Sequence, residues 1–538
     1  MTPQANLFAL LRAGFPPELD EVAIEIADTS TSTGTDTDTS ATAPCYSWRD
    51  LDRGTAMLAN LLDSLGLPVG SRVAVQTDKS VEALMLYLAV LRAGLVYLPL
   101  NPAYQRDEMA YFIRDAEPAV VVCAPKHFGW VSRLAFAPGA GPHTTPHTAH
   151  VFTLGADREG SLLQRAAVHS DLHTPALRRA DDVAAIVYTS GTTGRSKGAM
   201  LSHGNLASNA QVLQRHWRWK RGDVLIHALP IFHVHGLFVA SHGALLNGSK
   251  TIWLTRFDAK TVVSNLARAT VFMGVPTLYL RLLAEASFSR AACASMRLFV
   301  SGSAPLLRET FDRFRERSGF TILERYGMSE TLMLTSNPCD VADGERRGGT
   351  VGLPLPGVRL RVTDTADTGT ACRAEAIGAI EVIGPNVFEG YWRMPKETAQ
   401  AFSADGWFKT GDLGRIDPLG YVTIVGRSKD LIVSGGLNVY PAEIEAALNE
   451  IEGVADSAVI GVPHPDFGEA VVAVVVAVVV EVGVADPSAG LEVIAQLKSK
   501  IANFKVPKRL VFVGELPRNA MGKVQKNLLR DTHKDLFA

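Results

Sequence analysis

Residues 188–198 read YTSGTTGRSKG, and the apolar run of residues 184–188 leads directly into this segment. An apolar run that ends in a glycine-rich loop is typical of a buried β-strand that carries the loop at the edge of a sheet. The glycines at 191, 194 and 198 allow positive φ angles and a close approach of the backbone to a ligand. Because consecutive amides in such turns form a concavity that binds anions, the segment predicts an anion site at the end of a strand.

Side chains in the same loop support this interpretation. Hydroxyl donors come from Thr189, Ser190, Thr192 and Thr193. Lys197 adds a positive charge that can follow a phosphate. The Walker A pattern does not fit, because Lys197 stands three residues after Gly194 and is followed by Gly198. A short strand is expected over residues 199–201 and a helix only near Asn205, so loop amides and Lys197 must hold the phosphates. A solvated turn is the alternative interpretation.

The chain has 538 residues, which is too long for one hydrophobic core, so several domains are expected. A net charge of −2 provides no basic field, which disfavours nucleic-acid and membrane binding. Five scattered cysteines without a CxxC pair argue against a disulfide framework or a zinc site, and we expect a cytoplasmic protein. The N-terminus shows no signal-peptide pattern.

Helical and strand patterns alternate along most of the chain. Helices are expected over residues 50–65, 80–94 and 108–115, and strands over residues 22–27, 96–100, 119–123 and 298–300. This alternation predicts α/β layers around a largely parallel sheet. Residues 29–44 and 138–150 are polar and rich in Thr, Gly, Pro or His, so both are expected to be loops.

The composition changes near Gly426. Strands are then expected over residues 421–425, 458–462 and 469–480, and helices over residues 441–449 and 491–503. The run AVVAVVVAVVV at 470–480 is eleven residues long, whereas a spanning helix needs roughly 20, so it predicts a buried strand. We expect a large domain over residues 1–426 and a small α+β domain over residues 427–538, joined by the polar segment GRSKD at 426–430.

The opening loop resembles the phosphate loop of the adenylate-forming superfamily, which contains acyl-CoA synthetases, adenylation domains and luciferases. Further motifs follow in the family's order: ERYGMSE at 324–330, FKTGDLG at 408–414, GRSKD at 426–430 and PRNAMGKVQK at 517–526. The resemblance implies a large N-terminal AMP-binding domain of packed α/β layers and a small mobile C-terminal α+β domain. It also implies a reaction in two halves, in which a carboxylate attacks the α-phosphate of ATP and a thiol then displaces AMP.

The resemblance implies roles for individual residues. Glu330 and Thr189 coordinate Mg²⁺, which suits a hard cation that prefers oxygen ligands. Tyr326 stacks on adenine, or is a buried aromatic at a strand end. Asp412 accepts hydrogen bonds from the ribose, and Arg427 contacts ribose or phosphate, or forms an ordinary surface ion pair. The predicted nucleotide-binding residues are Thr189, Ser190, Gly191, Thr192, Thr193, Gly194, Lys197, Ser303, Ala304, Pro305, Glu324, Arg325, Tyr326, Gly327, Met328, Ser329, Asp412, Arg427 and Asn438.

Lys523 resembles the family lysine that reaches both the α-phosphate and the attacking carboxylate, although a solvated tail lysine is the alternative. The predicted catalytic set is Thr193, Lys197, Glu330 and Lys523. In the family the small domain rotates after the first half-reaction, here about Lys429. Lys523 then leaves, and the face with Ser434, Gly435 and Gly436 enters beside coenzyme A. Acylation of Lys523 by a regulator would block the first half-reaction, because it removes the charge.

Two segments bear on the carboxylic acid. In LPIFHVHGL (229–237) His233 resembles a gate and His235 faces the acid, unless both are packed histidines. In MGVPTLYLRLL (273–283) Arg281 stands among leucines. A fatty-acid pocket has no use for a guanidinium, whereas the second carboxylate of a diacid must be paired once it leaves water. A solvent-facing Arg281 on an amphipathic helix is the alternative.

These segments, with RLFVSGSAPLL and LPRNAMGKVQKNLLR, closely resemble bacterial malonyl-CoA synthetases, in which an arginine at this place pairs with the distal carboxylate of malonate. The resemblance implies an ATP-dependent malonate–CoA ligase that tolerates methylmalonate, with Arg281, His233, His235 and Ser303 at the acid. Another short-chain or aryl acyl-CoA ligase, or an adenylation enzyme that loads a carrier protein, is the alternative. The expected partners are malonate, ATP, Mg²⁺ and coenzyme A, and the expected state is a monomer or weak homodimer.

Overall fold

A computed structural model of the protein describes residues 4–27, 44–136, 148–189, 196–364, 372–373, 375–435, 437–477, 487–519 and 522–537. The predicted loop at 29–44, apart from Pro44, and most of the predicted loop at 138–150 lie outside the described residues. So do the loop positions Ser190, Gly191, Thr192, Thr193 and Gly194, and Gly436 in the C-terminal region.

A seven-stranded sheet forms the first layer and carries the strand that precedes the glycine-rich loop. Its strands in spatial order are β18 (Gly390–Tyr391), β8 (Lys197–Ser202), β7 (Val183–Thr189), β4 (Val96–Pro99), β3 (Arg72–Gln76), β5 (Val120–Cys123) and β6 (His150–Thr153). The strands from β7 to β6 run parallel, whereas β8 is antiparallel to both of its neighbours. The buried run of β5, VVVC, shows why the sequence predicts a strand covered on both faces.

A nine-stranded sheet forms a second layer. Its strands in spatial order are β15 (Leu353–Pro354), β14 (Leu332–Ser336), β13 (Leu323–Met328), β12 (Leu298–Ser301), β11 (Val271–Gly274), β9 (Val224–His227), β10 (Lys250–Trp253), β1 (Val22–Ile26) and β2 (Cys45–Ser47). The six strands from β13 to β1 are parallel, and the strands at both edges are antiparallel. The prediction of α/β layers with largely parallel sheets is confirmed for these two sheets.

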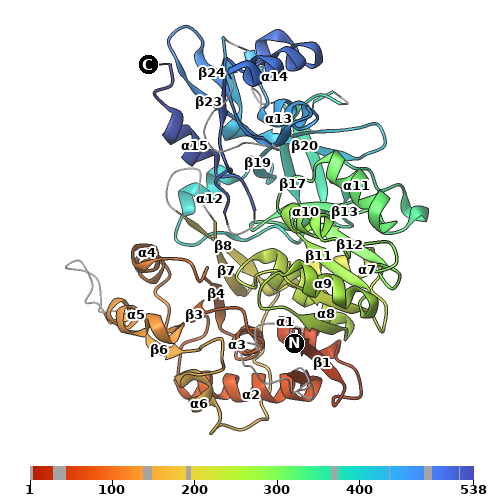
Figure 1. The fold of residues 1–538 in the computed structure, drawn as a ribbon. Helices are drawn as coiled ribbons and strands as arrows, with labels where there is room; N and C mark the ends of the chain where they lie inside the picture. Colours follow the sequence, from red (N-terminus) through yellow and green to blue (C-terminus); the bar gives the residue numbers. More distant parts are fainter. Residues whose placement is uncertain are drawn as a thin grey trace, which may run out of the picture.

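Helices cover both sheets (Figure 1). They are α1 (Leu7–Ala13), α2 (Trp48–Ser64), α3 (Val81–Arg92), α4 (Arg106–Ala116), α5 (Phe128–Ala135), α6 (Ser161–Ala166), α7 (His203–His216), α8 (His242–Asn247), α9 (Ala259–Asn265), α10 (Pro276–Ala284), α11 (Arg308–Ser318) and α12 (Pro395–Ala401). All twelve residues of α3 are buried. Tyr87 on α3 forms a 2.7 Å hydrogen bond with His242 on α8. This bond joins a helix associated with the seven-stranded sheet to a helix associated with the nine-stranded sheet.

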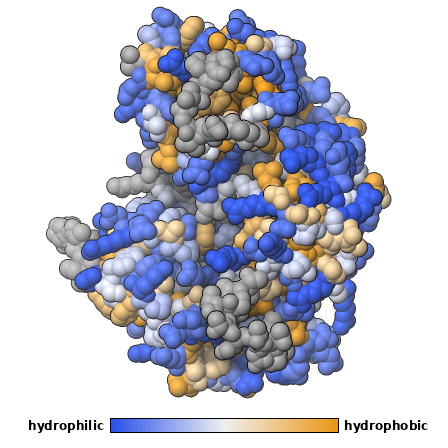
Figure 2. Space-filling model, viewed as in Figure 1, coloured by the Kyte–Doolittle hydropathy of each residue, from blue (hydrophilic) through white to orange (hydrophobic). Residues whose placement is uncertain are grey.

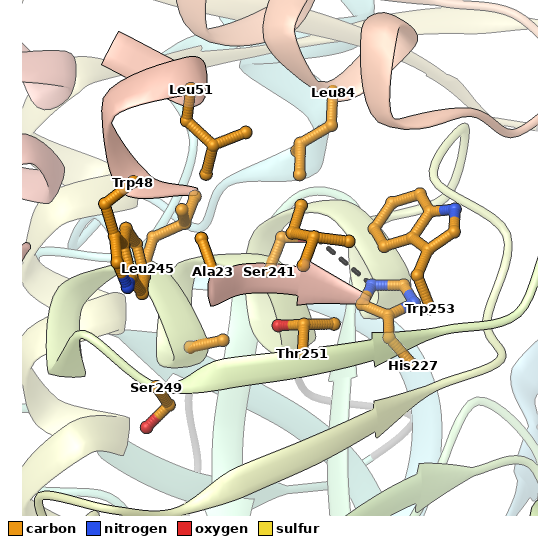
Figure 3. A pocket seen from close by; sticks show the side chains of 12 residues that line it. Ala23, Trp48, Leu51, Leu84, His227, Ser241, Leu245, Ser249, Thr251 and Trp253 are labelled. Atoms are coloured by element: carbon orange, nitrogen blue, oxygen red, sulfur yellow. Dashed lines mark hydrogen bonds between the residues drawn. The ribbon is translucent and has the colours of Figure 1, made fainter. Parts of the chain in front are cut away.

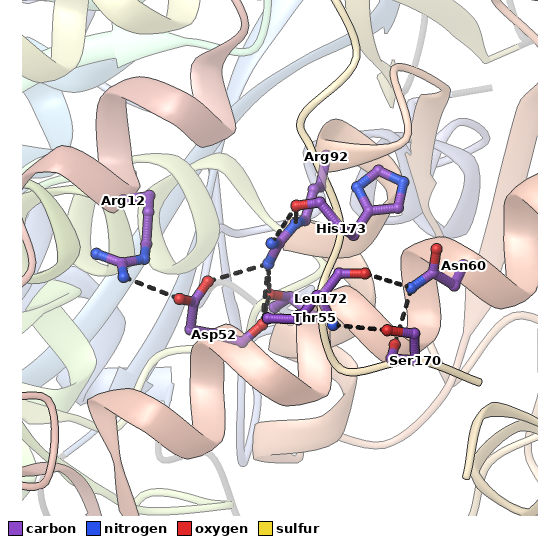
Figure 4. Close-up of polar contacts among 8 residues, drawn as sticks. All are labelled: Arg12, Asp52, Thr55, Asn60, Arg92, Ser170, Leu172 and His173. Atoms are coloured by element: carbon purple, nitrogen blue, oxygen red, sulfur yellow. Dashed lines mark hydrogen bonds and ion pairs between the residues drawn. The ribbon is translucent and has the colours of Figure 1, made fainter. Parts of the chain in front are cut away.

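Arg92, a buried arginine at the end of α3, holds the segment of residues 170–173 against the N-terminal helices (Figure 4). Arg92 donates to the carbonyl of Asp52 and to its carboxylate at 2.9 and 3.0 Å, and to the His173 carbonyl at 2.5 Å. Arg12 pairs with the other oxygen of Asp52 at 2.8 Å. Arg92 is only 6% exposed, so these bonds offset the cost of burying its charge.

A four-stranded antiparallel sheet follows in the chain and was not anticipated, although its last strand matches the strand expected over residues 421–425. It consists of β16 (Arg359–Thr363), β17 (Gly378–Ile383), β19 (Phe408–Ile416) and β20 (Val422–Arg427). A tight turn joins β19 to β20, because Asp417 Oδ1 accepts the amides of Leu419 and Tyr421 and Gly420 takes a φ of +87°. The FKTGDLG motif, which includes Asp412, thus lies in β19, the first strand of a hairpin.

The C-terminal region is a mixed α+β unit, as predicted. Its five-stranded sheet contains β22 (Leu437–Val439), β21 (Ile432–Ser434), β24 (Gly468–Ala477), β23 (Val454–His464) and β25 (Arg509–Phe512). Its helices are α13 (Pro441–Asn449), α14 (Pro487–Lys500) and α15 (Lys526–His533). Val471 and Val475 pack in one apolar cluster, and Val472 and Val474 pack in another. Residues 470–477 of the valine run therefore belong to a strand buried on both faces, as predicted, and residues 478–480 lie outside the described residues.

The C-terminal region, blue in Figure 1, lies above the two large sheets. The visible face is notched on its left side, between this region and the part of the chain that carries α4 (Figure 2). The predicted boundary between residues 426 and 427 falls one residue before the end of β20 and stays a prediction. Within the described part of the chain, we find no helix whose length and apolar character would suit a bilayer crossing.

Candidate nucleotide and acid site

The two ends of the glycine-rich loop are fixed by a hairpin. Thr189 ends β7, and Lys197 begins β8 and pairs directly with Thr189. The strand after the loop therefore begins at Lys197, two residues earlier than the predicted 199. Tyr111 on α4 donates a 2.6 Å hydrogen bond to the carbonyl of Ser196, which anchors the loop from a third element. Thr189 and Lys197 thus lie side by side at the base of the loop.

Glu330 stands beside this hairpin, as predicted. Its Oε1 accepts the hydroxyl of Tyr391 at 3.1 Å and that of Thr189 at a long 3.5 Å. The Lys197 ammonium lies 5.0 Å from the centre of the Tyr391 ring. Burial raises the pKa of Glu330 above its usual value, so a nearby cation would stabilise the ionised carboxylate. Tyr391 bridges two predicted site residues, yet sequence reasoning missed it, because it lies 61 positions from Glu330.

The oxygen donors of Glu330 and Thr189 fit Mg²⁺. This ion usually takes one or two carboxylates and completes its octahedron with phosphate oxygens and water. Across the described ranges, no cluster of three or more His, Cys, Asp or Glu side chains forms a cage for a metal. A single carboxylate beside a phosphate loop therefore suits a magnesium ion that arrives with a nucleotide.

Asp412 forms the next part of the site and joins three strands. Tyr326 on β13 donates its hydroxyl to Asp412 Oδ2 at 2.5 Å, and Arg427 on β20 pairs with Oδ1 at 2.6 Å. Burial raises the pKa of Asp412, and the charge of Arg427 opposes this effect. Arg427 is thus an ion-pair partner of Asp412 inside the site. A ribose that bound Asp412 would share these oxygens with Tyr326 and Arg427.

The segment after β12 lies against the loop that carries His233 and His235. Ser303 adopts a φ of +72°, and its Oγ lies 3.3 Å from Nδ1 of His235. Gly302 packs against the Arg325 guanidinium so closely that a Cβ there would stand 2.5 Å from Cζ. Only glycine fits at this position without displacing Arg325. A strained, non-glycine Ser303 beside a buried histidine marks this turn as a functional candidate.

Glu324 and Arg325 are 5% and 3% exposed on β13. Burial raises the pKa of Glu324 to about 8 and lowers the pKa of Arg325 to about 9. Burial, and then the Arg325 charge, also lower the pKa of His233 to about 4 and that of His235 well below its usual range. Both imidazoles are therefore neutral at physiological pH.

Several buried polar atoms in this area have no hydrogen-bond partner among the described residues. They are Ser301 Oγ, Glu324 Oε2, Arg325 Nε, Arg325 Nη2 and His235 Nε2. Such atoms are rare in folded proteins and usually face water or a ligand. Their concentration beside Ser303 therefore supports a polar ligand site here.

Lys523 reaches the same region from the C-terminal loop. Gly522 rests on α10, where an added Cβ would stand 2.9 Å from Thr277 Oγ1. The Lys523 amide donates to Asn519 Oδ1 at 3.0 Å, which shapes the turn. Lys523 remains exposed to solvent, but desolvation by the surrounding protein, and then the charge of Arg427, lower its pKa to about 8. The attraction of Asp412 opposes this shift, so the ammonium lies close to both groups.

A cavity of about 540 Å³ opens where the carboxyl ends of both large sheets meet α10 and the C-terminal loop. Arg281 on α10 lines it, together with Lys79, Phe232 and Asn519. Arg281 is exposed and lines this pocket, and its role at the acid stays a prediction. His233, His235 and Ser303 are not among the residues that line this cavity, although the neighbouring Phe232 is.

The remaining predicted residues lie in the C-terminal region. Lys429 belongs to the short helix η5 (Ser428–Asp430), and the adjacent Asp430 pairs with Arg530 at 2.5 Å. Ser434 is buried in β21, and Gly435 takes a φ of +56°. Asn438 is exposed on β22, and the contacts of the described residues do not bring it to Asp412 or Glu330. The predicted roles of these residues in coenzyme A binding stay predictions.

The comparisons with known proteins agree with this arrangement. Residues 37–392 match the AMP-binding enzyme family, and residues 443–523 match the AMP-binding enzyme C-terminal domain. The chain belongs to the AMP-binding enzyme family. It is an acid–thiol ligase of the acyl-CoA synthetase type, with a large N-terminal domain and a small C-terminal domain like those of other adenylate-forming enzymes.

Among solved structures, this AMP-binding enzyme is similar to ATP-bound MatB from Rhodopseudomonas palustris, with 50% identity, full coverage of both chains and a TM-score of 0.91. The apo form of the same protein gives a TM-score of 0.80 at the same identity and coverage. The chain is 33% identical to malonate–CoA ligase from Arabidopsis thaliana over 494 residues, 87% of this chain and 79% of the relative. It is 34% identical to feruloyl-CoA synthase from Amycolatopsis sp over 494 residues, 90% and 93% of the two chains.

Proposed function

We propose that this enzyme is an ATP-dependent malonate–CoA ligase that forms malonyl-CoA through a malonyl-adenylate, releases AMP and pyrophosphate, and also accepts methylmalonate. The observation that carries the proposal is the Arg281 guanidinium, which lines the pocket and forms no ion pair among the described residues. A short diacid supplies the missing anion. The similarity to MatB and to a malonate–CoA ligase supports the same substrate.

In the first half-reaction, the enzyme brings a carboxylate against the α-phosphate of ATP. Most of its catalysis is neutralisation of charge and positioning. Lys197 on β8 and Lys523 on the C-terminal loop would supply positive charge to the phosphates, and Arg427 adds a third cation beside Asp412. Glu330 and Thr189 would hold Mg²⁺, which supplies further neutralisation of phosphate charge. His235 offers a neutral, unpaired Nε2 near Ser303, which suits a hydrogen bond to the acid.

In the second half-reaction, the thiol of coenzyme A displaces AMP. We infer that residues 427–538 move as the small domain about Lys429, which withdraws Lys523 and brings Ser434 and Gly435 to the site. The arrangement with Lys523 directed at Asp412 suits adenylation. The higher TM-score with ATP-bound than with apo MatB supports this assignment of the conformation.

A second candidate function is an aryl acyl-CoA ligase. The cavity of about 540 Å³ is larger than a short diacid requires, and a feruloyl-CoA synthase is 34% identical over most of both chains. An aromatic monoacid would leave Arg281 without its anion, so the malonate proposal explains more of the site. An enzyme with either function forms a thioester with free coenzyme A, whereas an adenylation enzyme that loads a carrier protein does not. An assay for this thioester therefore distinguishes them.

Arg281→Ala tests the substrate directly. We expect pyrophosphate release with malonate to fall at least about a hundredfold in kcat/KM, because a desolvated carboxylate loses a charge-assisted partner. Activity with propionate, which lacks the second carboxylate, is expected to change by less than about threefold. Equal losses with both acids would contradict the assignment of Arg281. Arg256→Ala, at the same cavity, serves as a matched control for the loss of one cation.

A further inference from the structure

A lysine–histidine pair joins the two large sheets beside the pocket. Lys79 follows β3 of the seven-stranded sheet and lines the pocket. Its Nζ donates hydrogen bonds to the carbonyls of His227 at 2.8 Å and Leu254 at 2.7 Å, at the ends of β9 and β10. The ammonium also lies 4.3 Å from the centre of the Trp253 ring. The Lys79 side chain thus joins the pocket wall that follows β3 to the ends of β9 and β10 in the nine-stranded sheet.

This contact fixes the tautomer of His227. Lys79 Nζ lies 3.0 Å from His227 Nδ1, and an ammonium can only donate, so Nδ1 is the acceptor. Burial, and then the Lys79 charge, hold the pKa of His227 well below its usual range, so the ring is neutral. Its single proton must therefore stand on Nε2. Nε2 lies 3.0 Å from the Gly236 carbonyl. It also lies 3.2 Å from Ser241 Oγ (Figure 3).

Gly236 belongs to a π-helix, η2 (His235–Ser241), which begins at the predicted acid-binding histidine. Such helices are rare and frequently occur at functional sites. Gly236 is so closely packed that a Cβ there would stand 2.1 Å from the Pro230 carbonyl oxygen. Its carbonyl accepts from both His227 and Ser241, at 3.0 Å in each case. His227 therefore holds the first turn of η2, and with it the His235 ring that contacts Ser303.

We propose that Lys79 and His227 are positioning residues for the acid site, acting through Gly236 on His235 and Ser303. The proposal rests on the proposed function only in taking His235 and Ser303 as residues that contact the acid. Lys79 fixes the His227 tautomer, and this tautomer donates to Gly236 and sets the orientation of His235. Among the described residues, the side-chain hydrogen bonds of His227 run to Lys79, Gly236 and Ser241, and not to Glu330 or Asp412. Loss of the pair consequently weakens binding of the acid and leaves binding of ATP unchanged.

Two substitutions of His227 test its contact with Lys79 and its contact with Gly236 separately. In His227→Asn the amide oxygen reaches the place of Nδ1 and still accepts from Lys79, but the side chain no longer reaches Gly236. In His227→Gln the amide nitrogen reaches the place of Nε2 and still donates to Gly236. We expect H227N to raise the KM for the acid about tenfold or more, with the KM for ATP within about twofold. We expect H227Q to raise the KM for the acid by less than about threefold.

His242→Asn is the matched control. His242 is an equally buried, neutral histidine, but its partner is Tyr87 on α3. H242N is expected to lower the melting temperature without a selective change in the KM for the acid. The proposal is overturned if H227N and H242N show the same profile, or if H227N shifts both KM values equally. Should H227N fail to fold, Lys79→Met takes its place, with the same selective rise in the KM for the acid expected.

The acid in these assays is whichever acid the unmodified enzyme activates best. A selective rise in the KM for an aryl acid would support the positioning role and reject malonate as substrate. A selective rise for malonate would support both proposals. Malonate activity in the unmodified enzyme with no selective effect in H227N would reject the positioning role alone.

Discussion

The cations of the site differ in how firmly each is held. Lys197 is fixed by the β7–β8 hairpin, and Arg427 by its ion pair with Asp412. Lys523 is carried on a C-terminal turn, and its surroundings lower its pKa to about 8. Lys523 is consequently a cation of the site whose charge changes near pH 8.

The pH dependence of the first half-reaction tests this property of Lys523. The ammonium is charged below its folded-state pKa of about 8 and neutral above it, so kcat/KM for pyrophosphate release is expected to fall as pH rises from about 7 to about 9. The rate is measured with saturating ATP and subsaturating acid. Lys523→Arg keeps its charge throughout this range, so its slower reaction is expected to lack the alkaline fall. An alkaline limb of unchanged position in K523R would assign the titration to another group.

The sequence motifs named several residues that the structure brings together. Glu330, Asp412 and Lys523 were expected at the nucleotide, and the structure brings them near one another. Tyr391 and Lys79 were missed, because their roles come from contacts across 61 and 148 positions of sequence. No local pattern distinguishes such a tyrosine or lysine from an ordinary surface residue.

At the scale of elements, sequence periodicity located several strands and helices of the large sheets and of the C-terminal region. The helix over residues 441–449 and the strand over residues 119–123 are examples, because their apolar spacing matches the faces they bury. The antiparallel sheet of β16, β17, β19 and β20 was not predicted, because the alternation of elements before it favoured parallel strands. The π-helix η2 was also missed, because a widened turn leaves no trace in the spacing of apolar residues.

Helix α3 shows how the core supports the site. Leu86 is fully buried in α3, so Leu86→Ala removes apolar contacts and leaves a cavity. We expect it to lower the free energy of unfolding by about 2–5 kcal/mol, measured by denaturant titration with tryptophan fluorescence. Leu172→Ala is the control, because Leu172 is 79% exposed, and a change within about 0.5 kcal/mol is expected. Similar losses in both variants would contradict the buried position of α3.

At the scale of the whole molecule, the pocket forms where the two large sheets and the C-terminal loop meet. The carboxyl ends of parallel strands in both large sheets meet there, which is where α/β proteins commonly bind ligands. The C-terminal loop with Arg518 and Gly522 completes the wall. Sequence patterns predicted the layers and the small α+β unit, but not how the layers face one another, because that depends on long-range packing.

The central claim is that the enzyme uses ATP to join a small diacid to coenzyme A at this pocket. Product mass spectrometry after incubation with ATP, Mg²⁺, coenzyme A and an equimolar mixture of malonate, methylmalonate, octanoate and ferulate tests it most directly. We expect malonyl-CoA as the main thioester, methylmalonyl-CoA as a second product, and AMP in equal amount to total thioester. Feruloyl-CoA or octanoyl-CoA as the main product, with no malonyl-CoA, would contradict the account.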